Sequence, residues 1–407
     1  MKLLVVTHYF WPENFRVNDL VGELVRRGHE VTVLTGYPNY PDGVVFEDFK
    51  ANPESYAQYA GADIVRIPMA PRGKGSVRLA WNYLTFTLSA STLGLLRLRG
   101  RKFDRIFVYE PSPITVGLPA IVMKWVKKAP LTFWVLDLWP ETLRAVGMVK
   151  SERVLRLVGH LVSFIYRRCD VILAQSRSFI SNIRRYCHAS QRVEFFPSWA
   201  ENVFGKEKIE LAPELAPYAG RFKILFAGNI GEAQDFPAIL DAAEQLKTCT
   251  NIQWIFVGDG RMASWVADEI TRRGLQRTVT MLGRFPLERM PSFYAGADAL
   301  LVTLKRNEVF AMTIPGKVQS YLAAGRPLLG MLDGEGAAVI DDAKAGLTCF
   351  SGASARLAAL ARQLADTSLA ERQAMGAAGQ ACYREQFERN ALMDRIEQIL
   401  ADAGSQT

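Results

Sequence analysis

The sequence predicts an α/β protein built from two doubly wound domains, and three observations support this. Short apolar runs alternate with helical stretches along the chain, which is typical of parallel sheets covered by helices on both faces. A strand–loop–helix–strand unit over residues 3–34 recurs from residue 223. The length of 407 residues is that of two or three domains of about 150 residues each. Two such openings indicate two sheets instead of one long one.

Each half then continues with further strands and helices. In the first half a helix around 16–27 ends at Gly28, and strands are expected at 3–6, 30–34, 64–67, 105–109, 131–136 and 171–174. In the second half a helix is expected at 236–246, and strands at 223–227, 252–257, 279–282, 299–303, 327–330 and 346–349. Three final helices are expected at 354–365, 370–387 and 390–400.

The domain boundaries follow from composition. Residues 197–219 contain three prolines and no clear period, so we place the linker there. We therefore expect a first domain over 1–204, a second domain over 205–385, and a C-terminal helix over 386–407 that could pack back on the first domain.

The composition excludes several classes of protein. Apolar residues make up 49% and charged residues 22%, which excludes disorder, collagen and coiled coil for the chain as a whole. The five cysteines are scattered without CxxC spacing, so we interpret them as reduced residues of a cytosolic protein. The net charge of +8 is uneven, because residues 1–200 carry +11 and the remainder −3. This asymmetry suggests anionic partners for the first half.

One basic segment indicates contact with a membrane surface. Residues 64–103 contain eight basic residues and no acidic one, with apolar residues at near-helical spacing between them. The uncharged stretch 79–96 is too polar to span a bilayer, and the apolar run over residues 3–6 is too short for a signal peptide. We expect a surface for anionic lipid headgroups, whereas a solvated helix with an ordinary core face is the alternative. Nucleic acid is not expected, since no recognition motif is present. The candidate membrane residues are Arg72, Lys74, Arg78, Trp81, Arg97 and Arg99.

The loops after the second-half strands predict an anion site. Glycine turns at Gly228 and Gly258 could expose backbone N–H groups to phosphate, or could be plain turns. Arg284 and Phe285 pair a cation with a flat ring, which suits a nucleotide but also an ordinary surface. Asn229 lies in the first of these turns.

The strongest signal in this half is the segment 304–325. Thr313 is expected to cap a helix with Pro315 in its first turn, so that the helix start, Lys305 and Lys317 hold a diphosphate. Ile314 lies between the cap and the proline, and Gln319 or Ser320 could reach a ribose. A chance arrangement of one proline and two lysines is the alternative.

In the first half, two loops carry aromatic and carboxylate side chains. The loop 8–16 places Tyr9 and Trp11 beside Glu13, Asn14 and Arg16, as sugar-binding sites do, although a packed loop is the alternative. We interpret His8 as a core histidine. Asp137 ends a strand at the ligand edge of the sheet, where it could take a proton, orient a hydroxyl or cap the next turn. Glu141 follows it.

These residues carry a family resemblance over nearly the whole chain. The two halves, the loops 228–231, 257–260 and 282–285, and the turn 323–327 resemble a GT-B glycosyltransferase of family 4. A closer resemblance, to bacterial O-antigen and capsule transferases of the N-acetyl-fucosamine type, rests on residues 8–19, 35–41, 137–141, 195–199 and 313–325. The resemblance implies two domains facing a central cleft, and a retaining enzyme that needs no metal or other cofactor.

The sequence departs from the wider family at two places. That family usually carries two glutamates eight positions apart, where Met312 and Ser320 stand here, and an arginine and a lysine, where Asn229 and about Gln234 stand. We therefore expect the backbone amides after Met312 to bind phosphate, assisted by Lys305, Lys317 and Arg284. The departure leaves the sugar and ribose contacts open.

The resemblance implies sugar transfer from a UDP-sugar to a polyprenyl-diphosphate-linked saccharide, on the cytoplasmic face of the inner membrane. Asp137, Glu13 and Lys305 are then the candidate catalytic residues, and Tyr9, Trp11, Asn14, Arg16 and Glu141 the acceptor-binding ones. A UDP-sugar 2-epimerase of the same fold and a non-catalytic glycan- or lipid-binding relative are the two alternatives. The first would need no acceptor, and the second would follow from the missing glutamate pair.

Overall fold

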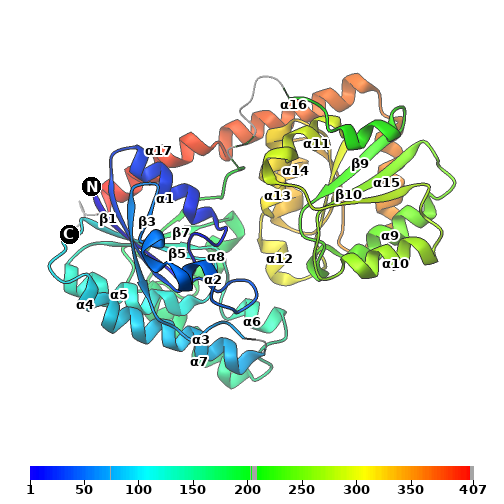
Figure 1. The fold of residues 1–407 in the computed structure, drawn as a ribbon. Helices are drawn as coiled ribbons and strands as arrows, with labels where there is room; N and C mark the ends of the chain where they lie inside the picture. Colours follow the sequence, from blue (N-terminus) through cyan, green and yellow to red (C-terminus); the bar gives the residue numbers. More distant parts are fainter. Residues whose placement is uncertain (74, 202, 204–208, 404–407) are drawn as a thin grey trace. The chain divides into compact units, whose positions relative to one another are not determined.

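The computed structural model describes residues 1–73, 75–201, 203 and 209–403, and it divides into two compact units. The first unit comprises Met1–Phe196 together with Asn390–Thr407, and the second comprises Pro197–Arg389. Each unit is built around its own sheet of mainly parallel strands (Figure 1). The predicted fold of two doubly wound α/β domains is thus confirmed.

The sheet of the first unit has the order β3-β4-β2-β1-β5-β6-β7-β8, and all of its strands are parallel except β3. The middle residues of its central strands are apolar and buried because helices cover both faces. The strands are β1 Lys2–Thr7, β2 Glu30–Gly36, β3 Gln58–Tyr59, β4 Ala62–Ile67, β5 Arg105–Glu110, β6 Leu131–Val135, β7 Val171–Ala174 and β8 Arg192–Phe195.

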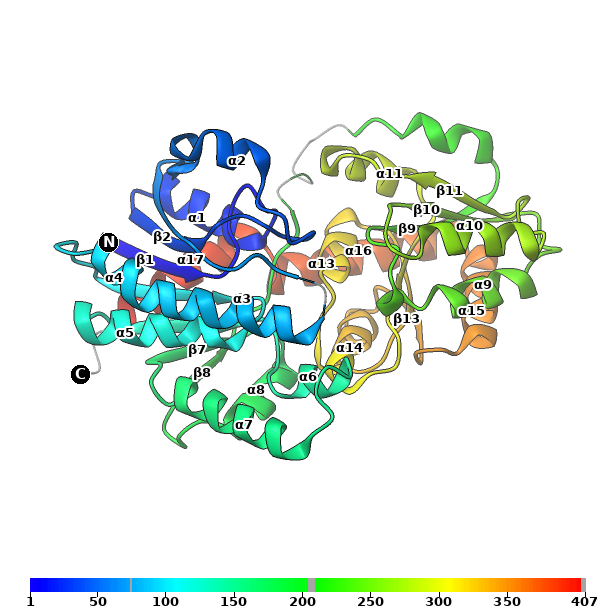
Figure 2. The same ribbon diagram turned by 60° about the horizontal axis from the view of Figure 1, so that its bottom comes forward.

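The helices of the first unit follow the strands in the usual βα order. The helix α3 continues through a π-helical turn, Ala90–Gly94, into α4. Helices α3, α5 and α7 are neighbours (Figure 2). The helices are α1 Arg16–Arg26, α2 Glu47–Ala51, α3 Ser76–Ser89, α4 Leu95–Arg97, α5 Gly117–Lys127, α6 Glu141–Ala145, α7 Glu152–Tyr166, α8 Arg177–Arg184 and α17 Arg389–Asp402.

The sheet of the second unit is entirely parallel, with the order β11-β10-β9-β12-β13-β14. Its core contains Phe226, Phe236, Trp254 and Phe256, all fully buried. The strands are β9 Phe222–Ala227, β10 Ile252–Val257, β11 Val279–Gly283, β12 Ala299–Thr303, β13 Leu328–Met331 and β14 Gly346–Cys349.

Helices cover both faces of this second sheet. The helix α9 packs beside α10 and α15, whereas α13 packs beside α11 and α16 (Figure 1). The helices are α9 Phe236–Gln245, α10 Ala263–Arg272, α11 Met290–Gly296, α12 Glu308–Met312, α13 Gly316–Ala324, α14 Glu335–Asp342, α15 Ser354–Asp366 and α16 Leu369–Gln386.

The last helix, α17, belongs to the first unit. Its residues Met393, Ile396 and Leu400 are buried. Arg27 of the first unit lies 2.5 Å from both Asp394 and Glu397. These contacts combine an apolar face with ion pairs, so α17 is part of the packing of the first unit.

The unit boundaries differ from the predicted 204 and 385, because they fall after Phe196 and after Arg389. Trp199 and Ala200 are buried, and Glu201 accepts a hydrogen bond from Ser320, so this segment packs within the second unit. Two strands, β3 and β8, were not predicted. The residues of β8 are only half-buried, so its sequence lacks the apolar run of the central strands.

Two further findings concern the described part of the chain. No helix there is long and apolar enough to cross a membrane. The five cysteines are all free, with Cys169 and Cys382 buried and the others half-buried.

Candidate active site

Each sheet has one point where the strand order reverses. In the first unit β1 lies between β2 and β5, and in the second unit β9 lies between β10 and β12. Loops that leave the carboxyl ends of the strands on either side of such a point form the ligand crevice of open α/β sheets. A ligand site is therefore expected among these loops in each unit.

In the second unit, three strand-end loops approach one another closely through glycines. The N–H of Gly258 donates to Gly283 O at 2.8 Å, and the N–H of Gly228 donates to Val257 O at 2.9 Å. A Cβ atom on Gly258 would lie 1.9 Å from the Gly228 oxygen, and Gly258 has a φ of +146°. The Asn229 side chain lies beside Gly231 and Gly260. The glycines are therefore required for the close packing of these loops.

Replacing Gly258 by alanine is expected to destabilise the protein by at least about 2 kcal/mol, because the backbone strain adds to a clash with main-chain atoms. Gly220→Ala is the matched control, since Gly220 has a φ of +79° but no atom within 4 Å of its Cβ position. Urea unfolding measures both variants. Equal losses of stability in the two variants would contradict the role of the close approach.

Lys317 lies against the first glycine loop. Its Nζ atom is 3.7 Å from the centroid of the Phe226 ring, and its Cε atom would lie 2.8 Å from a Cβ on Gly228. Burial lowers the pKa of Lys317 to about 7. No carboxylate within the described ranges forms an ion pair with it, and burial is the only cause of its lowered pKa, so this cation lacks a counter-ion in the structure.

The helix α13 carries Lys317 on its first turn and is anchored one turn later. The N–H of Ala227 donates to the Tyr321 hydroxyl at 3.0 Å, which fixes α13 beside the end of β9. Gly316, the first residue of α13, is exposed. The first amides of a helix have no acceptor within it, so they add positive potential beside Lys317.

The predicted cap of α13 is wrong in detail. The helix begins at Gly316 with Pro315 in the N-cap position, instead of Thr313. The Thr313 hydroxyl donates to Val309 O at 2.9 Å and ends α12, while Ile314 is buried. Pro315 has a ψ of 136°, an extended conformation that separates the two helices.

The other residues predicted to bind the nucleotide either contact neighbouring side chains and carbonyls or are exposed. The N–H of Lys305 donates to Ala233 O at 2.8 Å, and the charge of Lys305 faces Asp235. Phe285 packs against Phe293 with ring centroids 4.8 Å apart, and Arg284 is exposed.

Gln319 and Ser320 are both buried and directed elsewhere. The Gln319 side-chain amide lies against Pro315 O and Gly316 O, and its nitrogen is 2.8 and 3.2 Å from them when the amide is oriented to donate to both. The Ser320 hydroxyl donates to Glu201 Oε2 at 2.7 Å. Both side chains therefore stabilise the start of α13 and the segment that packs against it.

In the first unit, the loop after β1 forms an aromatic group. Tyr9 stacks on Phe15 with centroids 5.3 Å apart and contacts Tyr40 at 5.2 Å. Arg72 donates to the Tyr9 hydroxyl at 2.8 Å, and its guanidinium lies 5.4 Å from the centroid of the Tyr40 ring. Trp11 lies in a second aromatic group with Tyr56 and Tyr59.

Glu13 holds two loops together. Its carboxylate accepts hydrogen bonds from the N–H groups of Phe10, Asn39 and Tyr40 at 3.1, 2.8 and 2.7 Å. Burial raises the pKa of Glu13 to about 7, against the lowering effect of these N–H groups. The carboxylate is therefore used in positioning the loop that carries Tyr40.

Asp137 lies just beyond β6 with its carboxylate directed by two donors. Trp139 Nε1 donates to it at 3.2 Å and the Thr142 hydroxyl at 2.5 Å. Burial raises its pKa. Ser112, from the loop after β5, lies close to both Asp137 and Tyr83.

Glu110 is a candidate that the sequence interpretation missed. It ends β5 and is fully buried, and neither of its carboxyl oxygens has a hydrogen-bond partner within the described ranges. Burial, together with the nearby Asp137, raises its pKa well above the ordinary value. A glutamate at the carboxyl end of the predicted strand 105–109 was the signal that could have revealed it.

The remaining candidates of the first unit are dispersed. His8 is buried, with Nε2 2.9 Å from Asn82 Oδ1, and burial lowers its pKa to about 3. Asn14 is exposed, whereas Arg16 begins α1 beside Tyr109. The Glu141 carboxylate accepts from the Tyr186 hydroxyl at 3.0 Å.

The candidate membrane residues separate into three sets. Trp81 is 57% exposed on α3, Arg78 and Arg97 are exposed on the same helical segment, and Arg99 is exposed in the turn after it. Arg72 instead lies in the aromatic group of Tyr9 and Tyr40. Lys74 lies outside the described residues.

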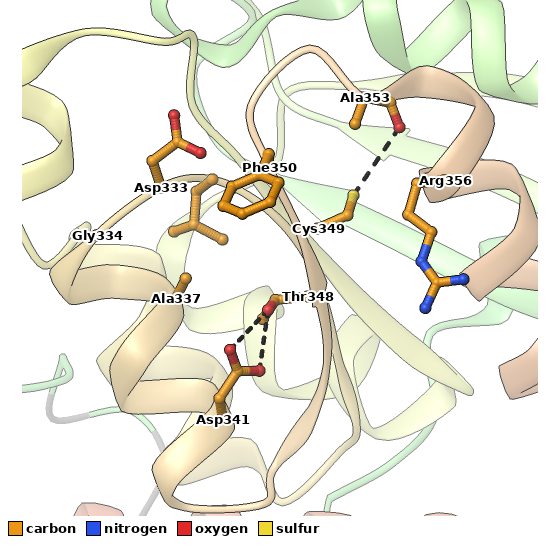
Figure 3. Close-up of a pocket in the computed structure, with 10 residues that line it drawn as sticks. Asp333, Gly334, Ala337, Asp341, Thr348, Cys349, Phe350, Ala353 and Arg356 are labelled. Carbon is orange, nitrogen blue, oxygen red and sulfur yellow. Dashed lines mark hydrogen bonds between the residues drawn. The ribbon is translucent and has the colours of Figure 1, made fainter.

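A separate cavity of about 330 Å³ lies at the carboxyl ends of β13 and β14 (Figure 3). Its acidic side chains are engaged, because Asp341 accepts from the Thr348 hydroxyl and Asp333 from the N–H of Ser351. None of the predicted site residues lines it. Within the described ranges, no cluster of three or more histidine, cysteine, aspartate or glutamate residues could hold a metal ion.

Two doubly wound units with close-packed glycine loops are compatible with many enzymes, and comparisons with known proteins show which family this chain belongs to. The chain matches the family models described as "Glycosyl transferase 4-like domain" over residues 14–199 and "Glycosyl transferases group 1" over residues 207–381. The chain belongs to the family 4 glycosyltransferases of the GT-B fold.

Two relatives share sequence with it. It is 27% identical to WcaI of Escherichia coli strain K12, named for colanic acid biosynthesis and glycosyl transfer, over 80% of this chain and 82% of that one. It is 28% identical to WbjE of Pseudomonas aeruginosa, named as a glycosyltransferase, over 58% of this chain and 60% of that one.

Two solved structures are similar in fold. One is Alr3699/HepE of Anabaena in complex with UDP, with a TM-score of 0.72, 14% identity and coverage of 99% of this chain and 100% of that one. The other is the UDP-forming α,α-trehalose-phosphate synthase of Burkholderia vietnamiensis, with a TM-score of 0.71, 14% identity and coverage of 99% and 96%. At these identities the likeness concerns the fold alone.

Proposed function

We propose that this glycosyltransferase moves a sugar, with retention, from a UDP-sugar to a polyprenyl-diphosphate-linked saccharide during bacterial polysaccharide synthesis. The observation that carries the donor half is Lys317, a cation without a counter-ion between a glycine loop and the start of α13. The relative named for colanic acid biosynthesis and the UDP complex of the structural neighbour support this proposal. An N-acetylated deoxysugar such as N-acetyl-fucosamine is the proposed donor sugar.

The second unit would stabilise the leaving group. UDP gains negative charge as the bond to the sugar breaks, and preorganised donors stabilise such charge most where water is excluded. Lys317 and the first amides of α13 would bind the diphosphate, with Lys305 from the neighbouring loop. The protein supplies these charges from its own residues, and no cofactor enters the proposal.

The first unit would bind the acceptor. Asp137 ends β6 with its carboxylate held by Trp139 and Thr142, which suits a group that orients the acceptor hydroxyl and takes its proton. The aromatic group of Tyr9, Phe15 and Tyr40 offers faces against which a sugar ring packs.

The acceptor's lipid implies contact with the cytoplasmic face of the inner membrane. The outer face of α3 exposes Val77, Trp81, Leu84 and Leu88 by 81, 57, 48 and 55%. These residues recur every three or four positions, so they form one stripe, with Arg78 beside it. An apolar stripe with flanking arginines suits an anionic bilayer surface.

The triple variant Trp81→Ser, Leu84→Ser, Leu88→Ser is expected to bind anionic vesicles about tenfold or more weakly, because it removes apolar area that would enter the bilayer. Its thermal unfolding is expected to stay near that of the unmodified protein, since the three side chains are exposed. Leu369→Ser is the control, because Leu369 is 60% exposed in the second unit. Vesicle flotation measures the binding, and unchanged binding of the triple variant would contradict the surface.

The proposed function is tested with the purified full chain, radiolabelled nucleotide sugars and a lipid-linked saccharide in detergent. The expected result is label in the lipid fraction with release of UDP. Transfer only from another class of nucleotide sugar would overturn the donor. Isomerisation of a UDP-sugar without lipid would favour the epimerase, and intact glycan assembly in cells carrying Lys317→Ala and Asp137→Ala would favour a non-catalytic role.

A further inference from the structure

Arg72 is a half-buried cation in uncharged surroundings. Its guanidinium donates to the Tyr9 hydroxyl at 2.8 Å and lies over the Tyr40 ring. The phenol of Tyr83 is a further neighbour. No carboxylate within the described ranges lies within 4 Å of it, whereas other arginines of this unit, such as Arg97 and Arg101, bond to carbonyl or carboxylate oxygens.

The guanidinium keeps donors for a ligand. Arginine has five N–H donors in a planar fork, and one nitrogen of Arg72 is engaged with Tyr9. Because the Tyr9 oxygen accepts that hydrogen bond, its own O–H remains to donate. A fork of guanidinium N–H groups with an adjacent phenol O–H matches the oxygens of a phosphate or diphosphate.

The segment that carries Arg72 is held in place from two sides. The N–H of Arg72 donates to Asn39 Oδ1 at 2.8 Å, and the N–H of Asn39 donates to the buried Glu13. A Cβ on Gly43 would lie 1.6 Å from the Arg72 oxygen, so the two segments are in direct backbone contact. A cation on such a constrained segment is preorganised, which lowers the entropy lost on binding.

The position of Arg72 joins two different surfaces. On one side are the aromatic rings of Tyr9 and Tyr40. Four positions further along the chain α3 begins at Ser76, and its exposed face carries Val77, Trp81 and Leu84. The inner face of α3 is tied to the same region, because Asn82 donates to Ala70 O at 2.6 Å and contacts His8.

We propose that Arg72, with the hydroxyl of Tyr9, binds the diphosphate of a lipid-linked acceptor, so that the sugar lies toward the aromatic group and the lipid toward the exposed face of α3. This inference rests on the proposed function, and it assigns Arg72 to substrate instead of to lipid headgroups. An uncharged acceptor would leave the Arg72 cation unpaired. The site therefore selects acceptors whose sugar and lipid are joined through a charged group over acceptors with an uncharged link.

The first test compares two acceptors with the same sugar and lipid, one joined through a diphosphate and one through an uncharged ether. Arg72→Met is expected to raise the KM for the diphosphate acceptor about 10- to 100-fold. The KM for the ether acceptor is expected to stay unchanged, as is UDP binding. Tyr9→Phe should show a smaller effect in the same direction. Lys50→Met, in the exposed Lys50–Glu47 pair of α2, is the control.

A second measurement separates this site from the proposed function. Calorimetry measures the binding of geranyl diphosphate to the full chain in the presence of saturating UDP. This measurement needs no turnover, so it supports the site even if no UDP-sugar is a donor. Loss of this binding in Arg72→Met supports the proposal. The proposal would be overturned if both proteins bound geranyl diphosphate equally, or if the unmodified enzyme used the two acceptors equally well. It would also be overturned if Arg72→Met lost only the binding of anionic vesicles.

Discussion

Lys317→Met is expected to lower kcat/KM for the UDP-sugar about 10²- to 10³-fold, which is the effect of removing one preorganised donor to a developing negative charge. The same variant is expected to be at least as stable as the unmodified protein. A half-buried ammonium without a counter-ion costs free energy of folding, and methionine fills a similar volume against Phe226 without that cost. Steady-state kinetics measure the loss of kcat/KM, and thermal unfolding measures the change in stability. Lys344→Met, at an exposed position of the second unit, is the control.

The stability difference should depend on pH in a defined direction. The pKa of Lys317 falls to about 7 in the folded protein, while the unfolded chain keeps the ordinary value of 10.5. Between these values the unfolded chain binds more protons, so raising the pH stabilises the folded protein. The advantage of Lys317→Met is therefore full below about pH 7 and disappears as the pH rises toward 10.5. A constant difference across this range would contradict the burial of an uncompensated lysine.

Asp137→Asn is expected to lower kcat about 10²- to 10⁴-fold with little change in UDP-sugar binding, because asparagine keeps the shape but cannot accept the proton. Burial raises the pKa of Asp137, so the acid limb of the kcat profile should lie at a higher pH than for an exposed aspartate. Pre-steady-state transfer and equilibrium UDP binding measure the two effects separately.

The competing role of Asp137 is to hold the turn that follows β6. If Asp137→Asn lost activity only in proportion to lost folded protein, the carboxylate would be a turn-forming residue, held by Thr142 and Trp139. Asp48→Asn, at an exposed position of α2, controls for the loss of one negative charge from the first unit.

The central strands were predictable because burial on both faces leaves a continuous apolar run. The segments 252–257 and 299–303 match β10 and β12 residue for residue. The strands β3 and β8 lie at the edges of their sheet, where one side is unpaired and polar residues are tolerated. Residues such as Arg192 and Glu194 therefore conceal the strand in the sequence.

The site was predictable only as far as strand ends and glycines mark it. Lys317 was a candidate because it follows a proline, but its approach to Gly228 spans nearly ninety residues and depends on Tyr321 fixing α13 to β9. The hydrogen bond of Arg72 to Tyr9, 63 residues away, has no local signal either. The Thr313 cap was wrong because threonine favours caps in general, whereas here its hydroxyl turns back to Val309.

The return of α17 to the first unit has a consequence for dividing the chain. A fragment cut after Phe196 would lack the helix that buries Met393, Ile396 and Leu400 and that pairs with Arg27. Such a fragment would expose an apolar groove to solvent and would be prone to aggregate, whatever the intrinsic stability of its sheet. A folded first unit would have to be made as a permuted chain, with residues 390–403 joined by a linker to Met1 or to Phe196.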